Sequence, residues 1–223
     1  MQRLGMITIG QAPRTDVAPI IERYLEGRAE LVQVGVLDGF AKAYIEQNLA
    51  PEPGHYVLTS RLTTGESVVF SREKIQPILQ GKIHELEETG ITQILLLCTG
   101  VFPGLKTNTA HLIEPDLIIP PAIKAMAGGR QLGVMVPLPE QTDNLQPKYA
   151  PLGLHPVFGI ASPYHNDEDN FHRAANELKA KSDLILLDCM GYTEKARELV
   201  QQISGKPVVL SNALMAKLVS EMI

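Results

Sequence analysis

Cysteine is scarce in this chain of 223 residues, which contains only Cys98 and Cys189. The two lie far apart in the sequence, and no Cys-x-x-Cys pair is present. This pattern is typical neither of a disulfide framework nor of a zinc site. We therefore expect two free thiols in a reducing compartment, the cytoplasm.

Long runs of one charge and long apolar runs are also missing. The 20 basic and 25 acidic residues give a net charge of -5 and are dispersed, so no basic footprint for nucleic acid is present. The apolar runs are strand-sized, well short of the roughly 18 residues that a membrane span needs, and residues 1–10 resemble a strand rather than a cleaved signal. The expected partners are small molecules or copies of the chain itself, as in a homodimer, and neither nucleic acid nor a membrane.

What the chain does contain is an alternation of apolar strand-length runs with amphipathic segments, which predicts an α/β fold with mostly parallel sheets. A β-hairpin is expected over 56–62 and 67–70, inserted in the first half. Asp38 is expected to cap the helix that follows it. The other expected strands are 4–9, 31–36, 93–98, 132–136, 157–161, 183–189 and 207–210, and the expected helices are 16–26, 38–49, 72–89, 139–149, 169–181, 193–203 and 212–222.

The two halves of the chain repeat one design, a helix, a Leu-rich strand and then Cys-x-Gly. The repeated strings are QILLLCTG at 93–100 and LILLDCMG at 184–191. We expect two similar flavodoxin-like lobes with a cleft between them, an N-terminal lobe over 1–127 and a C-terminal lobe over 128–223. The boundary near Gly128 is soft and leaves open a last helix that crosses back to the first lobe.

Both cysteines follow predicted central strands, where open α/β sheets bind their ligands. The N-terminus of a following helix favours a thiolate and can hold an anion. A cysteine that ends an apolar strand can equally complete the core, but the matched positions of the pair favour a site.

Two thiols that face one cleft suit a particular reaction. One, as thiolate, removes a proton from a carbon acid, and the other, as thiol, returns a proton to the opposite face. Backbone N–H groups of the turns Thr99-Gly100 and Met190-Gly191 are candidates to stabilise the carbanion. This chemistry requires no metal and no organic cofactor.

Polar residues after other predicted strands are further candidates for substrate binding. Arg14 is suited to bind a carboxylate or a phosphate, and Gln11 lies in the same turn. Alternatively, Arg14 is a surface arginine beside a capped helix. The turn lacks the ending of a Walker loop. Ser211 and Asn212 follow the last predicted strand, where they line the cleft or where one of them caps the last helix.

A cluster of acidic residues and histidines follows the strand predicted over 157–161. The spacing of its members does not match a metal ligand set, so no metal site is expected there. Asn166 or Asp167 is instead expected to cap the next helix. The cluster consists of His165, Asp167, Asp169 and His172.

Several strings resemble known families. Residues 92–223 resemble the aspartate/glutamate/hydantoin racemase superfamily through a strand ending in Cys98, IIPPA at 118–122, GVMV at 133–136, LDCMG at 187–191 and GKPVVLS at 205–211. Nearly the whole chain is similar to the AroM family through TIGQAPRTD at 8–16, LDC at 187–189 and LSNA at 210–213. The chain departs from the racemases after each cysteine, where they usually have Asn-Thr and Thr.

These resemblances imply a cofactor-independent racemase or epimerase that acts on a small carboxylate, amino acid or hydantoin-like compound, with Cys98 and Cys189 as its acid/base pair. Two alternatives stay open. A decarboxylase or cis-trans isomerase of the same superfamily would use one cysteine. A non-enzymatic protein of the AroM family would bind a small metabolite in the same cleft.

Overall fold

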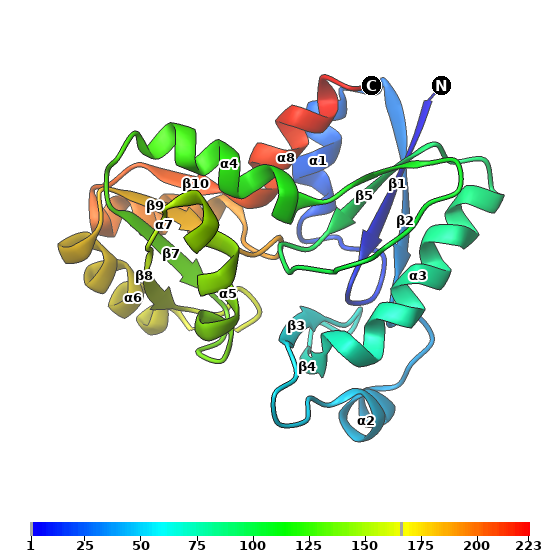
Figure 1. Ribbon diagram of the computed structural model, residues 1–223, viewed down its shortest axis with the longest axis horizontal. Coiled ribbons are helices and arrows are strands. Elements are labelled where there is room, and N and C mark those ends of the chain that lie inside the picture. Colours follow the sequence, from blue (N-terminus) through cyan, green and yellow to red (C-terminus); the bar gives the residue numbers. More distant parts are fainter. Residues whose placement is uncertain (1, 166) are drawn as a thin grey trace.

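The computed structural model describes residues 2–165 and 167–223 (Figure 1). The strands are β1 (Gln2–Thr8), β2 (Ala29–Gly35), β3 (Val57–Arg61), β4 (Ser67–Ser71), β5 (Gln93–Leu97), β6 (His111–Ile113), β7 (Leu132–Val136), β8 (Val157–Ile160), β9 (Leu184–Leu187) and β10 (Val208–Leu210). The helices are α1 (Ala18–Leu25), α2 (Lys42–Tyr44), α3 (Arg72–Glu88), α4 (Pro115–Ala127), α5 (Gln141–Tyr149), α6 (Glu168–Lys181), α7 (Glu194–Ser204) and α8 (Ser211–Ser220), with a π-helical turn η1 (Ile45–Leu49) and a 3-10 turn η2 (Ala150–Leu152).

Two parallel sheets have the same strand order. The first is β2-β1-β5-β6 and the second, read in the matching direction, is β8-β7-β9-β10. In each sheet the strands that come first and third along the chain are neighbours, and the order reverses between them. The α/β class with mostly parallel sheets is thus confirmed, and so is the antiparallel hairpin of β3 and β4.

Alternation along the central strands divides the core into layers. In β1, Leu4 and Met6 face one cluster, whereas Ile7 faces another, as expected when successive side chains point to opposite faces. The cluster around Leu4 includes residues of α1, α4, α8 and both sheets, so these helices lie between the two sheets. Helix α3 and the hairpin cover the outer face of the first sheet, and α6 and α7 cover that of the second.

The last helix joins the two halves. Helix α8 follows β10 of the second sheet and packs against α1, which follows β1 of the first (Figure 1). The division into lobes at 127 and 128 stays a prediction. None of the helices in the described ranges is both long and apolar enough to cross a membrane.

Two local predictions were wrong. Asp38 does not cap a helix, because its carboxylate accepts hydrogen bonds from the N–H groups of Ala12 and Gly35 at 2.8 and 2.7 Å, and the next helix begins only at Lys42. Strand β6 was missed because only two of its 3 residues, Leu112 and Ile113, are apolar, too short a run to indicate a strand. By contrast, Asp167 caps α6 by accepting a hydrogen bond from the Asn170 N–H at 3.0 Å; the alternative cap, Asn166, lies outside the described residues.

Candidate active site

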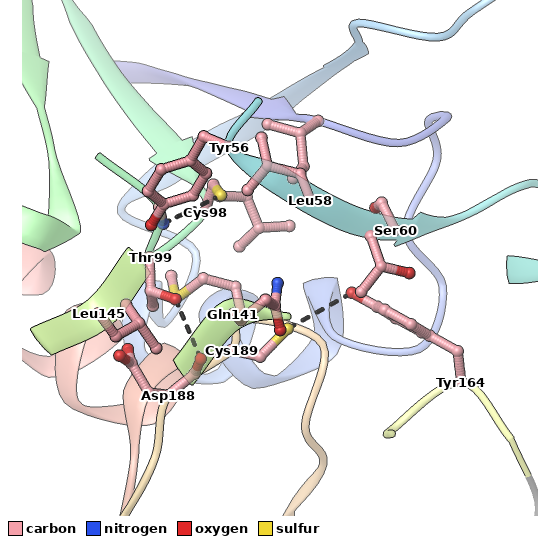
Figure 2. A pocket seen from close by; sticks show the side chains of 15 residues that line it. Tyr56, Leu58, Ser60, Cys98, Thr99, Gln141, Leu145, Tyr164, Asp188 and Cys189 are labelled. Atoms are coloured by element: carbon pink, nitrogen blue, oxygen red, sulfur yellow. Dashed lines mark hydrogen bonds between the residues drawn. The ribbon is translucent and has the colours of Figure 1, made fainter. Parts of the chain in front are cut away.

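The two cysteines follow equivalent strands of the two sheets. Cys98 comes directly after β5 and Cys189 comes two residues after β9, in each case the third strand of its parallel sheet along the chain. Both line one cavity of about 30 Å³ (Figure 2). Its walls are Ile9, Tyr56, Leu58, Thr59, Ser60, Leu97, Cys98, Thr99, Gly100, Gln141, Leu145, Tyr164, Asp188, Cys189 and Met190.

Cys98 is a buried thiol whose sulfur accepts a backbone hydrogen bond from the Gly100 N–H at 3.2 Å. Burial raises the pKa of Cys98 to about 12. The N–H of Gly100 opposes this rise, as does the positive charge of Lys148, whereas Cys189 adds to it. At neutral pH this residue is therefore a thiol, with a donor already in place to stabilise its thiolate.

Cys189 is half-buried and has a richer set of partners. Its sulfur accepts a hydrogen bond from the Gly191 N–H at 3.4 Å and lies 3.5 Å from the Tyr164 hydroxyl (Figure 2). Burial raises its pKa, while Gly191, Tyr164 and the charge of Arg14 oppose the rise. A Cβ at position 191 would overlap the phenol of Tyr164, so glycine leaves room for this ring.

A buried ion pair connects the chain segments that carry the cysteines. The ammonium of Lys148, on α5, lies 3.1 and 3.0 Å from the two carboxylate oxygens of Asp188 and donates to the Thr99 carbonyl at 2.9 Å. Both side chains are at most 2% exposed. The Tyr149 hydroxyl donates to Asp188 at 2.8 Å, and the Thr99 hydroxyl donates to the Asp188 carbonyl at 3.1 Å. These contacts fix Thr99 next to Asp188, and thereby Cys98 relative to Cys189.

Strand β3 of the hairpin forms another wall of the cavity. Tyr56, Leu58 and Ser60 are spaced two residues apart and so share one face of the extended segment. Figure 2 shows their side chains around the pocket together with both cysteines. The hairpin packs directly on the turn after β1, where a Cβ on Gly10 would overlap Ser60 and the Arg61 carbonyl.

The turn after β1 does not present its polar residues to the cavity. Arg14 is 3% exposed and makes two hydrogen bonds of 2.8 Å to the carboxylate of Asp16, and it also donates to the Thr8 hydroxyl at 3.1 Å. Burial alone would lower the pKa of Arg14, but Tyr164 and Asp16 outweigh it and the net shift is upward. Its contribution at the site is a fixed positive charge beside Tyr164, whose ring centre lies 5.8 Å from the guanidinium carbon.

Gln11 holds the hairpin in place. Its amide N–H group donates to the carbonyls of Leu37 and Phe40 at 3.1 and 2.9 Å, and its oxygen accepts from the Thr63 N–H at 3.0 Å. These bonds tie the hairpin turn to the loop after β2. Gln11, like Arg14, is absent from the cavity walls formed by the described residues.

Of the candidate residues after the second cysteine and at the start of α8, only one lines the cavity, and the others make hydrogen bonds within the protein. Met190 lines the cavity, whereas the Gly191 N–H serves the sulfur of Cys189. The Ser211 hydroxyl donates to the Leu187 carbonyl at 2.7 Å, and Asn212 donates to the Met190 carbonyl at 3.0 Å. Neither side chain caps α8, whose N-cap position is Leu210, so the expected cap was wrong. Both instead support the turn that carries Cys189.

No group of three or more His, Cys, Asp or Glu side chains is arranged to hold a metal within residues 2–165 and 167–223. The sequence pattern assigns no role to Lys148, Tyr56 or Ser60, and it allows Tyr164 to reach a pocket without indicating which one. Their signal is weak, because each lies on an element distant in the sequence from the cysteine that it approaches. Asp188 was visible next to Cys189, but its partner lies 40 positions earlier.

The AroM protein family matches residues 4–223. The chain belongs to the AroM family. Comparison with curated protein sequences gives no match.

Solved structures of low sequence identity share the fold of this AroM protein. The allantoin racemase from Klebsiella pneumoniae has a TM-score of 0.65 at 16% identity and covers 100% of this chain and 87% of its own. The aspartate racemase of Picrophilus torridus has a TM-score of 0.63 at 13% identity, with 99% and 95% covered. An unliganded arylmalonate decarboxylase has a TM-score of 0.60 at 16% identity, with 100% and 92% covered. The chain thus has a racemase-like fold over its full length.

Proposed function

We propose that this protein is a cofactor-independent racemase or epimerase of a small carbon acid, such as a carboxylate, an amino acid or a hydantoin-like compound. Cys98 and Cys189 are its acid/base pair. The observation that carries this proposal is that both thiols follow equivalent strands of two like-ordered sheets and line one cavity. Structural neighbours that are racemases of allantoin and aspartate support it.

The proposed reaction needs one thiolate and one thiol. The thiolate takes the proton next to a substrate carbonyl, an S–H bond forms, and the C–H electrons stay on the substrate as an enolate. The second thiol then gives its proton to the opposite face of the same carbon. The N–H groups of Gly100 and Gly191 donate to the two sulfurs, so each stabilises its cysteine when that cysteine is the thiolate.

The raised pKa values set the pH dependence of this reaction. Burial raises the pKa of Cys98 to about 12 and also raises that of Cys189, so both groups rest as thiols at neutral pH. At a pH below the pKa of the thiol, the fraction of reactive thiolate rises about tenfold for each unit by which the pH increases. We expect kcat/KM to rise with pH from 7 to 9, and a rate that falls over this range would contradict a thiolate base.

The direct test is hydrogen exchange at the substrate α-carbon. The protein is incubated in deuterated water with pooled amino acids, hydroxy acids and hydantoins, and loss of α-hydrogen is followed by NMR. We expect exchange that is abolished in both Cys98→Ala and Cys189→Ala and retained in Ser182→Ala, a buried serine remote from the cavity walls. Retention in both cysteine variants would refute the proposal, and absence of exchange with every compound would favour a metabolite-binding protein.

A second candidate is a one-cysteine reaction, such as decarboxylation or cis-trans isomerisation. The unequal surroundings of the thiols favour it, because only Cys189 of the two has a phenol hydroxyl against its sulfur among the described residues. The fold is also similar to that of an arylmalonate decarboxylase. In the same assay, extended to product detection, this candidate predicts that Cys189→Ala is inactive and Cys98→Ala retains activity.

A further inference from the structure

Ser60 is a buried hydroxyl without a protein partner at the proposed site. The side chain is 1% exposed, and its oxygen has no hydrogen-bond partner in residues 2–165 and 167–223. A buried hydroxyl left unpaired costs folding free energy, so native proteins seldom keep one without a use. The Ser60 hydroxyl is therefore available to bond a ligand, and it belongs to a residue on the wall of the cavity that both cysteines line.

Several other donors near this cavity are already engaged. The N–H groups of Gly100 and Gly191 donate to the cysteine sulfurs, and the Thr99 hydroxyl donates to the Asp188 carbonyl. The Thr59 hydroxyl, next to Ser60, donates to the Val68 carbonyl at 3.0 Å. An enolate forming between the thiols needs a donor for its oxygen, and these groups are committed elsewhere.

The position of Ser60 is rigid. Its strand pairs with β4, where Ser60 lies opposite Val68, and the Gln11 N–H holds the next carbonyl, that of Arg61, at 3.1 Å. The turn at Gly10 packs against its side chain. A donor fixed on a paired strand is preorganised for a ligand atom, as recognition and catalysis both require.

We propose that Ser60, on strand β3 of the hairpin, is a substrate-recognition residue whose hydroxyl donates a hydrogen bond to a carbonyl or carboxylate oxygen of the substrate. This inference rests on the proposed function for the class of ligand, a carbon acid with an oxygen acceptor next to the reacting carbon. It makes the hairpin a wall of the substrate site rather than a peripheral insertion. Leu58, between Tyr56 and Ser60 on the same face, would contact an apolar substituent.

The test separates recognition from structure by measuring two quantities in Ser60→Ala. The probes are 5-benzylhydantoin, mandelate and aspartate, with binding followed by saturation-transfer NMR and titration calorimetry. Ser60→Ala should bind the preferred probe about tenfold more weakly than wild type, since one hydrogen bond to the ligand is lost. Its unfolding midpoint should stay equal or rise, because removal of this buried hydroxyl loses no protein hydrogen bond.

The matched control is Ser182→Ala, whose buried hydroxyl donates to the Leu178 carbonyl at 2.7 Å. It should bind the probe like wild type and unfold more readily. Unchanged binding by Ser60→Ala, a stability loss like that of the control, or failure of all three probes to bind wild type would overturn the inference. Weakened binding in Ser60→Ala combined with no α-hydrogen exchange in wild type would instead support it while refuting the racemase proposal.

Discussion

Replacing Lys148 with methionine removes the cation that links the two cysteine-bearing segments. The ammonium makes three contacts of 2.9 to 3.1 Å, two to the Asp188 carboxylate and one to the Thr99 carbonyl. Methionine has similar length and apolar bulk but no donor. The Asp188 carboxylate, itself fully buried, would then keep the Tyr149 hydroxyl as its side-chain partner in the described structure.

The expected destabilisation of Lys148→Met is about 3–5 kcal/mol, the usual cost of removing one member of a buried ion pair. That is a large part of the roughly 5–15 kcal/mol that holds a typical domain folded. Most of the cost comes from the charge left on Asp188 rather than from lost attraction. Lys148→Met combined with Asp188→Asn, which removes that charge, should therefore recover more than half of the loss.

Urea unfolding of wild type, both single variants and the double variant gives the free energies for this comparison. A loss below about 1 kcal/mol in Lys148→Met would place the pair in the class of surface salt bridges and refute the argument. No recovery in the double variant would show that packing, not charge, dominates. Lys148→Met alone should also raise the pKa of Cys98 further, since the charge of Lys148 opposes the effect of burial there.

Three further predictions concern the cavity and its surroundings. The pKa of Cys98 is raised to about 12 in the folded protein, so its thiol favours the folded state below pH 9 and this contribution is lost as the pH rises toward 12. In urea unfolding, wild type should therefore lose about 2 kcal/mol of stability relative to Cys98→Ala between pH 7.5 and 10.5. A constant difference between the two proteins would contradict this. Gly191→Ala should destabilise by about 1–3 kcal/mol in the same assay through overlap with Tyr164, whereas Gly81→Ala, in open space on helix α3, should stabilise slightly; equal effects would exclude the steric reason. Ser67, on the hairpin, lies 3.1 Å from the ring of His165, the residue after Tyr164, which contacts the Cys189 sulfur. Loss of this contact in Ser67→Ala should raise the rate of Cys189 alkylation by iodoacetamide a few-fold, and an unchanged rate would show that the contact does not shield the thiol.

The sequence was informative wherever one segment carries its own pattern. Apolar runs of five residues predicted β5 and β7, and the matched strings around Cys98 and Cys189 predicted their equivalent places in two sheets. The hairpin followed from two apolar runs around a short turn. Each of these patterns depends on neighbours in the sequence, so burial and period are visible without tertiary structure.

Side-chain pairing was beyond these local patterns, even between residues that are close in the sequence. Arg14 was expected to bind substrate, but its guanidinium pairs with the carboxylate of Asp16. A spacing of two residues in a turn allows this pairing but does not require it. Lys148 appeared to be an ordinary charge on the helix predicted over 139–149, and only the approach of α5 to the strand ends buries it against Asp188. The partner of a charged side chain is therefore set by the fold and cannot be derived from the local sequence.

The repeated architecture gives the two cysteines the same backbone and different surroundings. Each sulfur accepts the N–H of the glycine two residues on, because the two strand-to-turn segments are alike. The outer shell differs, because the hairpin covers the side of Cys98 and the loop bearing Tyr164 covers that of Cys189. A symmetric reaction requires each thiol to act as both acid and base in turn, whereas surroundings this unequal give the two directions of proton transfer different barriers. With saturating substrate, deuterium incorporation measured separately from each enantiomer of an active compound should therefore give unequal kcat values, while kcat/KM stays equal because the two enantiomers have the same free energy. Equal kcat values would mean that the shared backbone bonds, not the outer shell, govern the thiols.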